Sequence, residues 1–191
     1  MICVTHTYTR STSVKRQRLN NLLGALALAL NDRVEDAIAR ETGLHGSSAD
    51  ALVLLSQAHA LTIDSLARQL MLVHSSAVRL AERMAQEGLV EREPGEDKRT
   101  VVLTLTEAGH AAVQQILAAR GSAIADVTRT LTPEQCAQLM PICEQLVGTL
   151  ADDMHNAIRV CRQCDEDACD LRRCPSERAY RRFAAERDAG G

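Results

Sequence analysis

The hydrophobic pattern of this chain changes period within one short stretch, and that change limits the folds it can adopt. Apolar residues recur at helical spacing from about residue 17 to residue 87. The segments 89–92 and 100–105 then have the pattern of two β-strands, with Pro94-Gly95-Glu96-Asp97 as the turn between them. Helical spacing returns at Thr106. A hairpin embedded in a helical chain predicts a mainly α fold with a small β-hairpin wing.

The composition agrees with a helical protein. Only 2% of the 191 residues are aromatic while 46% are hydrophobic, so Leu, Ala, Val and Ile must build the core. Strands prefer aromatic and β-branched residues, so this balance disfavours a β-sandwich. The formal net charge of −3 is not that of a strongly basic nucleic-acid binder. Binding to nucleic acid requires a local basic face rather than a basic total, so that class of function stays open.

Cap residues and glycines predict where the helices begin and end. Gly43 is placed to end a first helix, Thr62 can cap a short helix, and Gly88 can end the next one. Thr132-Pro133 marks another helix start. The expected helices span residues 17–42, 48–58, 63–70, 75–87, 106–129 and 132–160.

A stretch near the start resembles a secretion signal but is better explained as part of a helix. Basic residues precede the apolar run Leu22–Leu30, and the leucine stripe then continues through Val34 and Ile38. One stripe extending past the run indicates an amphipathic helix. No apolar run reaches the length of a membrane span. We therefore expect a cytoplasmic protein without a membrane partner, with its thiols kept reduced.

Two short helices, a tight connection and a hairpin follow in the order of a winged helix-turn-helix, whose second helix enters the DNA major groove. In that helix, helical spacing predicts a buried face made of Val73, Ala77, Leu80 and Met84. The opposite face carries polar groups suited to base edges and phosphates. Those residues are Ser75, Ser76, Arg79, Glu82, Arg83 and Gln86. A merely solvated polar face would look similar, so both interpretations remain open for this helix alone.

The hairpin makes the comparison more specific. The stretch 79–92, then Asp97-Lys98-Arg99, then Leu105-Thr106-Glu107-Ala108-Gly109, resembles the MarR family of regulators. In that family these segments are a recognition helix, a wing with an Asp-x-Arg motif, and the start of the next helix. The resemblance is close over about residues 50–112, and it extends over 17–158 in helix order.

The resemblance implies roles for individual residues. Arg99 would enter the minor groove, where a narrow groove attracts arginine. Asp97 would hold the wing in shape without contacting DNA. The residues expected to face the major groove are Ser75, Ser76, Arg79 and Arg83. The alternative for Asp97-Lys98-Arg99 is a solvated charged turn, and the acidic residues Glu91, Glu93 and Glu96 would weaken phosphate binding by the wing.

The long terminal helices resemble the dimerisation domain of the same family. This implies a homodimer on a double-stranded, pseudo-palindromic operator, acting as a repressor. It also implies a small-molecule effector in a cleft, although nothing in the sequence identifies that molecule. We expect a mobile basic arm over 1–16, a helical dimerisation domain over 17–46 and 107–160, a winged helix-turn-helix over 47–106, and a Cys-rich tail over 161–191. The alternatives are a monomer with these helices closed on each other, and a winged-helix module that binds other proteins.

The tail contains four cysteines, Cys161, Cys164, Cys169 and Cys174, in the spacing C-x2-C-x4-C-x4-C. Four thiolates in so short a stretch can surround one tetrahedral Zn²⁺. An iron–sulfur cluster, redox-active disulfides that sense oxidation, and no special role are the alternatives. A zinc or redox enzyme is disfavoured, because four cysteines close the zinc shell and leave no open position for catalysis. We therefore expect a regulator, not an enzyme, with a tail that responds to metal or to redox state.

Overall fold

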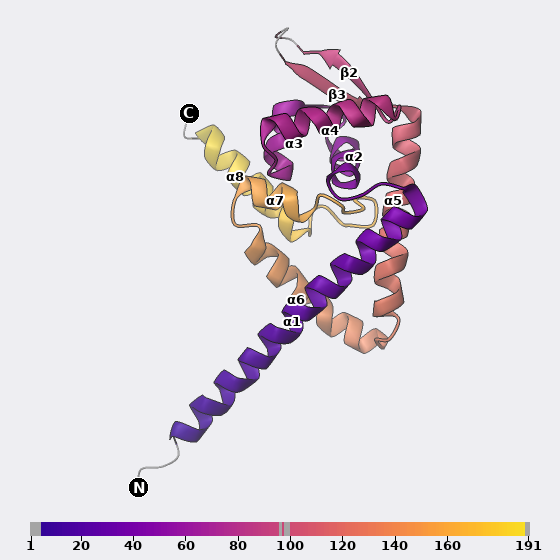
Figure 1. Cartoon of the computed structure of the whole chain (residues 1–191). Helices are drawn as coiled ribbons and strands as arrows, with labels where there is room; N and C mark the ends of the chain where they lie inside the picture. The colour runs from indigo at the N-terminus through magenta and orange to yellow at the C-terminus, as the bar shows by residue number, and fades with distance from the viewer. Residues whose placement is uncertain (1–4, 96, 98–99, 190–191) are drawn as a thin grey trace.

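The computed structural model describes residues 5–95, 97 and 100–189, with the side chains described from Val14 onward. It is mostly helical with a small antiparallel sheet, which confirms the predicted fold class (Figure 1). The elements in chain order are α1 (Thr5–Thr42), α2 (Ser47–Ala58), β1 (Leu61–Thr62), α3 (Ile63–Leu70), α4 (His74–Gln86), β2 (Val90–Pro94), β3 (Val101–Leu105), α5 (Glu107–Thr128), α6 (Pro133–Leu150), α7 (Met154–Val160) and α8 (Pro175–Ala189).

Three threonines start helices where the sequence predicted. The hydroxyl of Thr62 accepts from the Ser65 amide at the start of α3. At the start of α5, the Thr106 hydroxyl accepts from the Gly109 amide. Thr132 and Gln135 form a reciprocal capping box at the start of α6. Each cap satisfies backbone amides that have no partner inside the helix, so these boundaries could be inferred from sequence.

The sheet has the strand order β1-β3-β2, with both pairs antiparallel. β2 and β3 form the predicted hairpin, in which Val90 pairs with Leu105 and Pro94 with Val101. β1 has only two residues, and Leu61 pairs with Leu103. A strand so short has no readable alternation, so the sequence did not predict it. It joins the start of the helix-turn-helix to the base of the wing.

A single large core lies beneath the helix-turn-helix. Ile38 of α1, Leu66 of α3, Met84 of α4, Leu103 of β3 and Ile116 of α5 are almost fully buried in one cluster. These residues come from four helices and from the sheet, so the core fixes how α4 is presented. The C-terminal half of α1 joins this core by packing on α5.

Glycine 109 explains the start of α5. A Cβ at this position would collide with the backbone carbonyl oxygen of Leu89, which also accepts from the Thr106 amide at 3.1 Å. The Thr106 hydroxyl donates to the Gly88 carbonyl at 2.6 Å. The Leu-Thr-x-x-Gly motif therefore joins α5 to the loop before β2 and requires the absence of a side chain at Gly109.

Four expectations about this architecture require correction. α1 begins at Thr5, so residues 5–16 continue the helix instead of forming a separate arm. The last long helix is broken: α6 ends at Leu150, and the Asp153 carboxylate caps a new helix, α7, by accepting from the Asn156 amide at 2.7 Å. The tail also contains the helix α8, which was not expected. Finally, Val73 is 69% exposed, and Ala81 takes its place in the buried face of α4.

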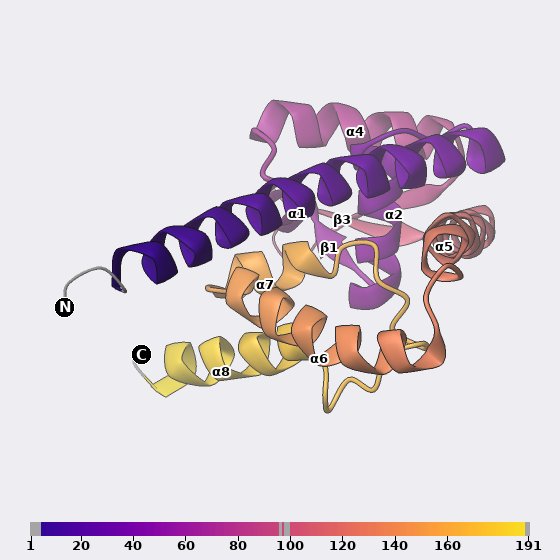
Figure 2. The same ribbon diagram turned by 90° about the horizontal axis from the view of Figure 1, so that it is seen from below.

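The two ends of the molecule are arranged differently (Figures 1 and 2). The N-terminal half of α1 projects away from the rest of the chain. The segment from α6 to α8 folds back instead, with α7 lying against α3 and α8. Within the part of the chain that the structure describes, no helix has both the length and the apolar character needed to cross a membrane.

Candidate nucleic-acid interface and cysteine segment

The turn between α3 and α4 fixes the angle of the candidate recognition helix. Met71 adopts a left-handed conformation (φ 54°), and its amide donates to the Arg68 carbonyl at 3.2 Å. The imidazole of His74, at the start of α4, lies 2.8 Å from the Asp64 carboxylate. This contact joins the first turns of the two helices, so α4 is held from both its buried face and its N-terminus.

The polar face predicted for α4 is present. Ser75 and Arg79 are exposed and Ser76 is half-buried, on the side opposite Ala77 and Leu80. Among the residues that the structure describes, none pairs with or hydrogen-bonds to the Arg79 guanidinium. Arg79 is thus a cation available to an external anion.

Arg83 has a different environment. Its Nη2 donates to the Ser48 hydroxyl at 2.9 Å, and Ser48 is a buried residue in the first turn of α2. The guanidinium is therefore tied to α2 and joins the recognition helix to it. The predicted contact of Arg83 with DNA stays a prediction.

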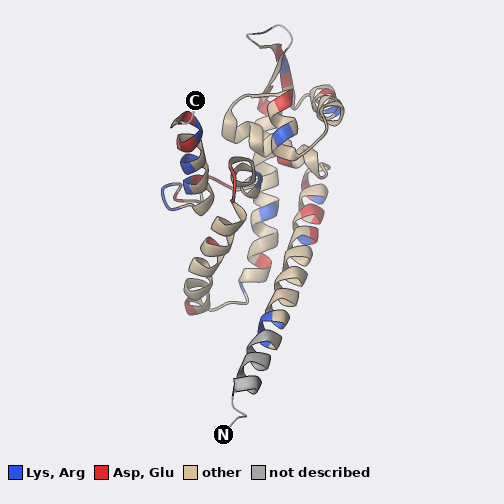
Figure 3. Ribbon diagram, turned by 90° about the vertical axis from the view of Figure 1, so that its left-hand side faces the viewer, with Lys and Arg blue, Asp and Glu red and all other residues tan. Residues whose placement is uncertain are grey.

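The wing is described in part. Arg99, which was expected to enter the minor groove, lies outside the described residues, as does Glu96. Asp97 is described, and its backbone carbonyl accepts from the amide and the hydroxyl of Thr100 at 2.8 and 2.7 Å, which closes the turn. Glu91 and Glu93 are exposed on β2, on either side of Arg92 (Figure 3).

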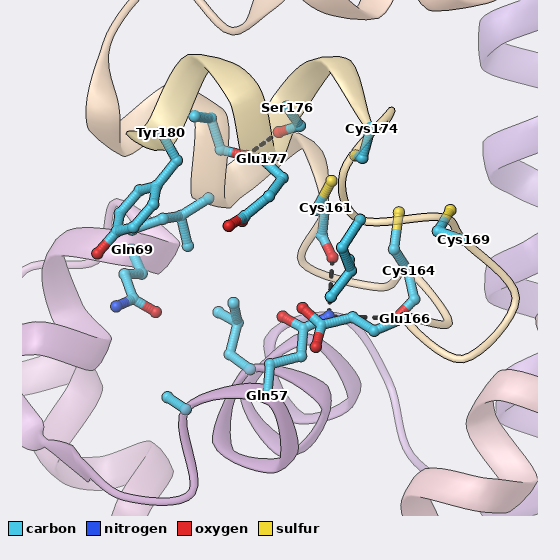
Figure 4. A pocket seen from close by; sticks show the side chains of 15 residues that line it. Gln57, Gln69, Cys161, Cys164, Glu166, Cys169, Cys174, Ser176, Glu177 and Tyr180 are labelled. Carbon is cyan, nitrogen blue, oxygen red and sulfur yellow. Dashed lines mark hydrogen bonds between the residues drawn. The ribbon is translucent and has the colours of Figure 1, made fainter. Parts of the chain in front are cut away.

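The four cysteines of the tail line one cavity of about 240 Å³, between α2, α7 and α8. Figure 4 shows their sulfur atoms gathered on one side of this cavity, with Gln69 and Tyr180 on the opposite side. The sequence grouped these cysteines by spacing, and the fold brings them together. The structure describes no three His, Cys, Asp or Glu side chains placed closely enough to hold a metal ion.

Two of these cysteines form a pair with opposite acidities. A hydrogen bond with Cys164 and then burial raise the pKa of the Cys161 thiol well above its usual range. The same hydrogen bond lowers the pKa of Cys164 against the effect of burial, and the Arg120 guanidinium on α5 adds to this lowering. Burial, followed by the charge of Cys174, raises the pKa of Cys169. Cys164 is therefore the more acidic of these two thiols, and Cys161 the less acidic.

Polar contacts fasten the cysteine segment to α2. The side-chain nitrogen Nε2 of Gln57 donates to the backbone carbonyls of Cys161 and Cys164, at 3.2 and 3.1 Å. The Asp50 carboxylate accepts from Arg162 Nε at 3.0 Å and from Gln163 Nε2 at 2.6 Å. Sequence reasoning missed Asp50 and Gln57, because each is an ordinary polar residue on a helix far from its partners in sequence.

A further contact reaches the helix-turn-helix itself. Arg159 of α7 donates to the sulfur of Met71, the residue that ends α3 just before α4. The tail therefore lies against both α2 and the turn that sets the angle of the recognition helix.

Comparisons with known proteins agree with this geometry. Residues 47–101 match the model of the MarR family. The HTH-type transcriptional regulator PapX of Escherichia coli is 20% identical over 138 residues, which cover 69% of this chain and 84% of PapX.

Solved structures show the same fold. YusO from Bacillus subtilis is 22% identical with a TM-score of 0.61, over 70% of this chain and 95% of YusO. A MarR family protein from Bacillus stearothermophilus is 24% identical with a TM-score of 0.62, over 70% and 94%. A mutant of MarR from E. coli complexed with operator DNA is 24% identical with a TM-score of 0.53, over 65% and 93%.

The matched segment contains the helix-turn-helix and most of the wing described above. It ends before the cysteine segment, so the tail is an addition to the matched domain. The family consists of transcription regulators and not of enzymes. Residues 47–101 of this chain therefore match the MarR family of transcriptional regulators, and the chain has the winged helix-turn-helix fold of that family's solved structures.

Proposed function

We propose that this protein is a cytoplasmic homodimeric repressor that recognises a pseudo-palindromic operator through α4 and the wing. The observation that carries the proposal is the polar face of α4, where Ser75, Ser76 and Arg79 stand opposite the core and no described residue pairs with Arg79. Hydroxyl and guanidinium groups at the N-terminal part of such a helix suit base edges and phosphates. A mutant of MarR with the same fold is known in complex with operator DNA, which supports this use of the fold.

Unpartnered apolar residues support the homodimer. Leu22 and Leu26 on the projecting part of α1 are 57% and 48% exposed. No residue of α6 is buried, and its Ile142 is 54% exposed. Apolar stripes on long helices are stable in water when another surface covers them. We assign that surface to a second copy of the chain, with α1 and α6 as the contacts.

DNA footprinting on the region upstream of the chain's own gene tests operator recognition. Two protected half-sites about 10 bp apart are expected, because recognition helices related by a two-fold axis reach successive major grooves. No protection at concentrations that saturate a known relative would contradict the proposal and would favour a protein-interaction module.

Sedimentation tests the dimer separately from DNA binding. The wild type should sediment as a dimer, and Leu22→Glu/Leu26→Glu should shift it to a monomer with unchanged helix content. Leu171→Glu, which changes an exposed leucine in the tail, is the matched control and should leave the dimer intact. A wild type that is monomeric at micromolar concentration would contradict the assignment.

A groove of about 950 Å³ between α1 and α5 is the place we assign to a small-molecule effector. Arg33 and Arg40 line it beside the carboxylates of Asp36, Glu41 and Asp126, so an organic acid would have to bind through the two arginines. Calorimetric titration with a panel of aromatic acids tests this assignment. Binding that Arg40→Ala weakens supports it, and binding that is unaffected by substitutions in the groove contradicts it.

The state of the cysteine tail should regulate DNA binding. Arg159 of α7, just before the tail, contacts Met71 in the turn of the helix-turn-helix, and the tail contacts Asp50 on α2. In turn, α2 binds Arg83 of the recognition helix through Ser48. A change in the tail can therefore alter the position of α4 through side chains that touch one another. Operator affinity should differ between reduced, oxidised and chelator-treated protein. Identical affinities in all three preparations would show that the tail does not regulate binding.

A further inference from the structure

The segment between α7 and α8 contains all four tail cysteines and no helix or strand. Short backbone turns hold it: the amide of Cys164 donates to the Cys161 carbonyl at 2.8 Å, and that of Cys174 to the Asp170 carbonyl at 2.9 Å. The amide of Cys169 donates to the Glu166 carbonyl at 3.2 Å. Each of these three cysteines is thus placed by a turn, as in sites where a short loop wraps around an ion.

The apolar support for this segment is small. Its own buried cluster consists of Ala151, Ala157 and Ala179, with Phe183 packed alongside. Three methyl groups and one ring remove little apolar surface from water, and modules with so little core usually depend on a metal or on disulfides. Apart from Ile158 of α7, which packs on the main core, this small cluster supplies little apolar stabilisation, and a cross-link would add to it.

We propose that Cys161, Cys164, Cys169 and Cys174 are the four ligands of a single Zn²⁺ ion. They line one cavity, and their sulfur atoms gather on the same side of it (Figure 4). Four thiolates complete the tetrahedral shell that Zn²⁺ prefers, so the ion has a structural and not a catalytic role. This centre does not depend on the proposed DNA binding.

The present arrangement is close to such a centre without being one. Cys161, Cys164 and Cys174 are partly buried at the cavity, whereas Cys169 is exposed on the loop. Binding of Zn²⁺ would form a zinc–sulfur bond to each of the four cysteines, and each thiol that becomes a ligand would release its proton to solvent.

Neighbouring groups favour the charged form of this centre. A zinc ion with four thiolates has a net negative charge, and Arg120 on α5 is close enough to stabilise negative charge on Cys164. The Gln57 amide already orients the carbonyls of Cys161 and Cys164. Groups of this kind around the ligands hold them in place and commonly change metal affinity 10–100-fold when removed.

Elemental analysis of the full chain, purified without oxygen and without an affinity tag that binds metal, tests the proposal. One zinc ion per chain is expected. Co²⁺ added to chelator-treated wild type should give the intense thiolate-to-cobalt absorption and the visible bands of a tetrahedral site. Iron in place of zinc, a Cys161–Cys164 disulfide in the purified chain, or an octahedral Co²⁺ spectrum would overturn the proposal.

Cysteine variants assign the ligands. Cys164→Ser and Cys174→Ser should each weaken Zn²⁺ binding more than about 100-fold, because losing a ligand should cost more than losing an outer-shell partner. Cys136→Ser and Cys143→Ser are the matched controls, since both residues are exposed on α6, and they should bind Zn²⁺ as the wild type does. Equal affinities across all four variants would overturn the assignment. The Co²⁺ titration of wild type decides the question even if a tail variant fails to fold.

Discussion

The winged helix-turn-helix and the cysteine tail lie against each other but are stabilised in different ways. The winged helix-turn-helix is held by a large apolar core, in which Leu52, Leu66, Met84 and Leu103 are almost fully buried. The tail's own cluster consists of three alanines, and its fastening to α2 is polar. Apolar burial is non-directional and cumulative, whereas polar contacts each add little net stability. The DNA-reading part should therefore be rigid, and the tail should respond to changes in its few contacts.

The largest expected effect is on the shared core. Leu66→Ala should lower the free energy of unfolding by about 2–5 kcal/mol, because it removes buried methyl groups and leaves a cavity. Leu171→Ala, at an exposed leucine of the tail, should change it by less than about 0.5 kcal/mol. Urea denaturation followed by circular dichroism measures both. Comparable losses for the two variants would mean that the regions are stabilised alike.

Two glycines of α5 sharpen the comparison within one helix. Gly109→Ala should destabilise the protein by about 1–3 kcal/mol, because its new methyl group meets the fixed Leu89 carbonyl. In Gly121→Ala, the added methyl group meets no other atom within 4 Å, so this variant should stabilise the helix by about 0.5–1 kcal/mol. Thermal denaturation should show shifts of opposite sign. A neutral Gly109→Ala would contradict the close approach of α5 to the loop before β2.

A smaller effect is expected where the tail meets α2. Asp50→Asn weakens the acceptor of the hydrogen bonds from Arg162 and Gln163. It should lower the free energy of unfolding by about 0.5–1.5 kcal/mol. Hydrogen exchange should rise over residues 154–189 and stay unchanged over α3 and α4. Asp126→Asn, which alters an exposed pair with Arg129 on α5, is the control and should leave exchange in the tail as it is. Unchanged exchange in the tail of Asp50→Asn would show that this contact does not hold it.

The same contrast explains how much could be predicted from sequence. The helix-turn-helix and the wing follow local rules, so the Thr62 and Thr106 caps and the hairpin turn were readable directly. Their residues also carried the family resemblance. The sequence wrongly placed Val73 in the buried face of α4. Val73 precedes the helix as its N-cap, and the buried face includes Ala81 instead; helical spacing alone fits both sets of residues.

The arrangement of the tail could not be read in the same way. Four cysteines at close spacing predict that they will meet, and they line one cavity. Nothing in the spacing shows that Asp50 and Gln57 receive the segment, because these contacts join residues more than a hundred positions apart. The break after Leu150 was masked by the apolar periodicity that continues through α7. Polar contacts between residues far apart in the chain leave no local pattern in the sequence.

The most direct test of the account is the salt dependence of operator binding by Arg79→Ala. Loss of a phosphate contact should weaken binding by about 1–3 kcal/mol and reduce the slope of log affinity against log salt by about one unit. Ser76→Ala should leave the slope unchanged, since it removes no charge, and Arg129→Ala on α5 should change neither quantity. If Arg79→Ala keeps its fold and binds the operator with the affinity and salt slope of wild type, the claim that α4 reads DNA is contradicted.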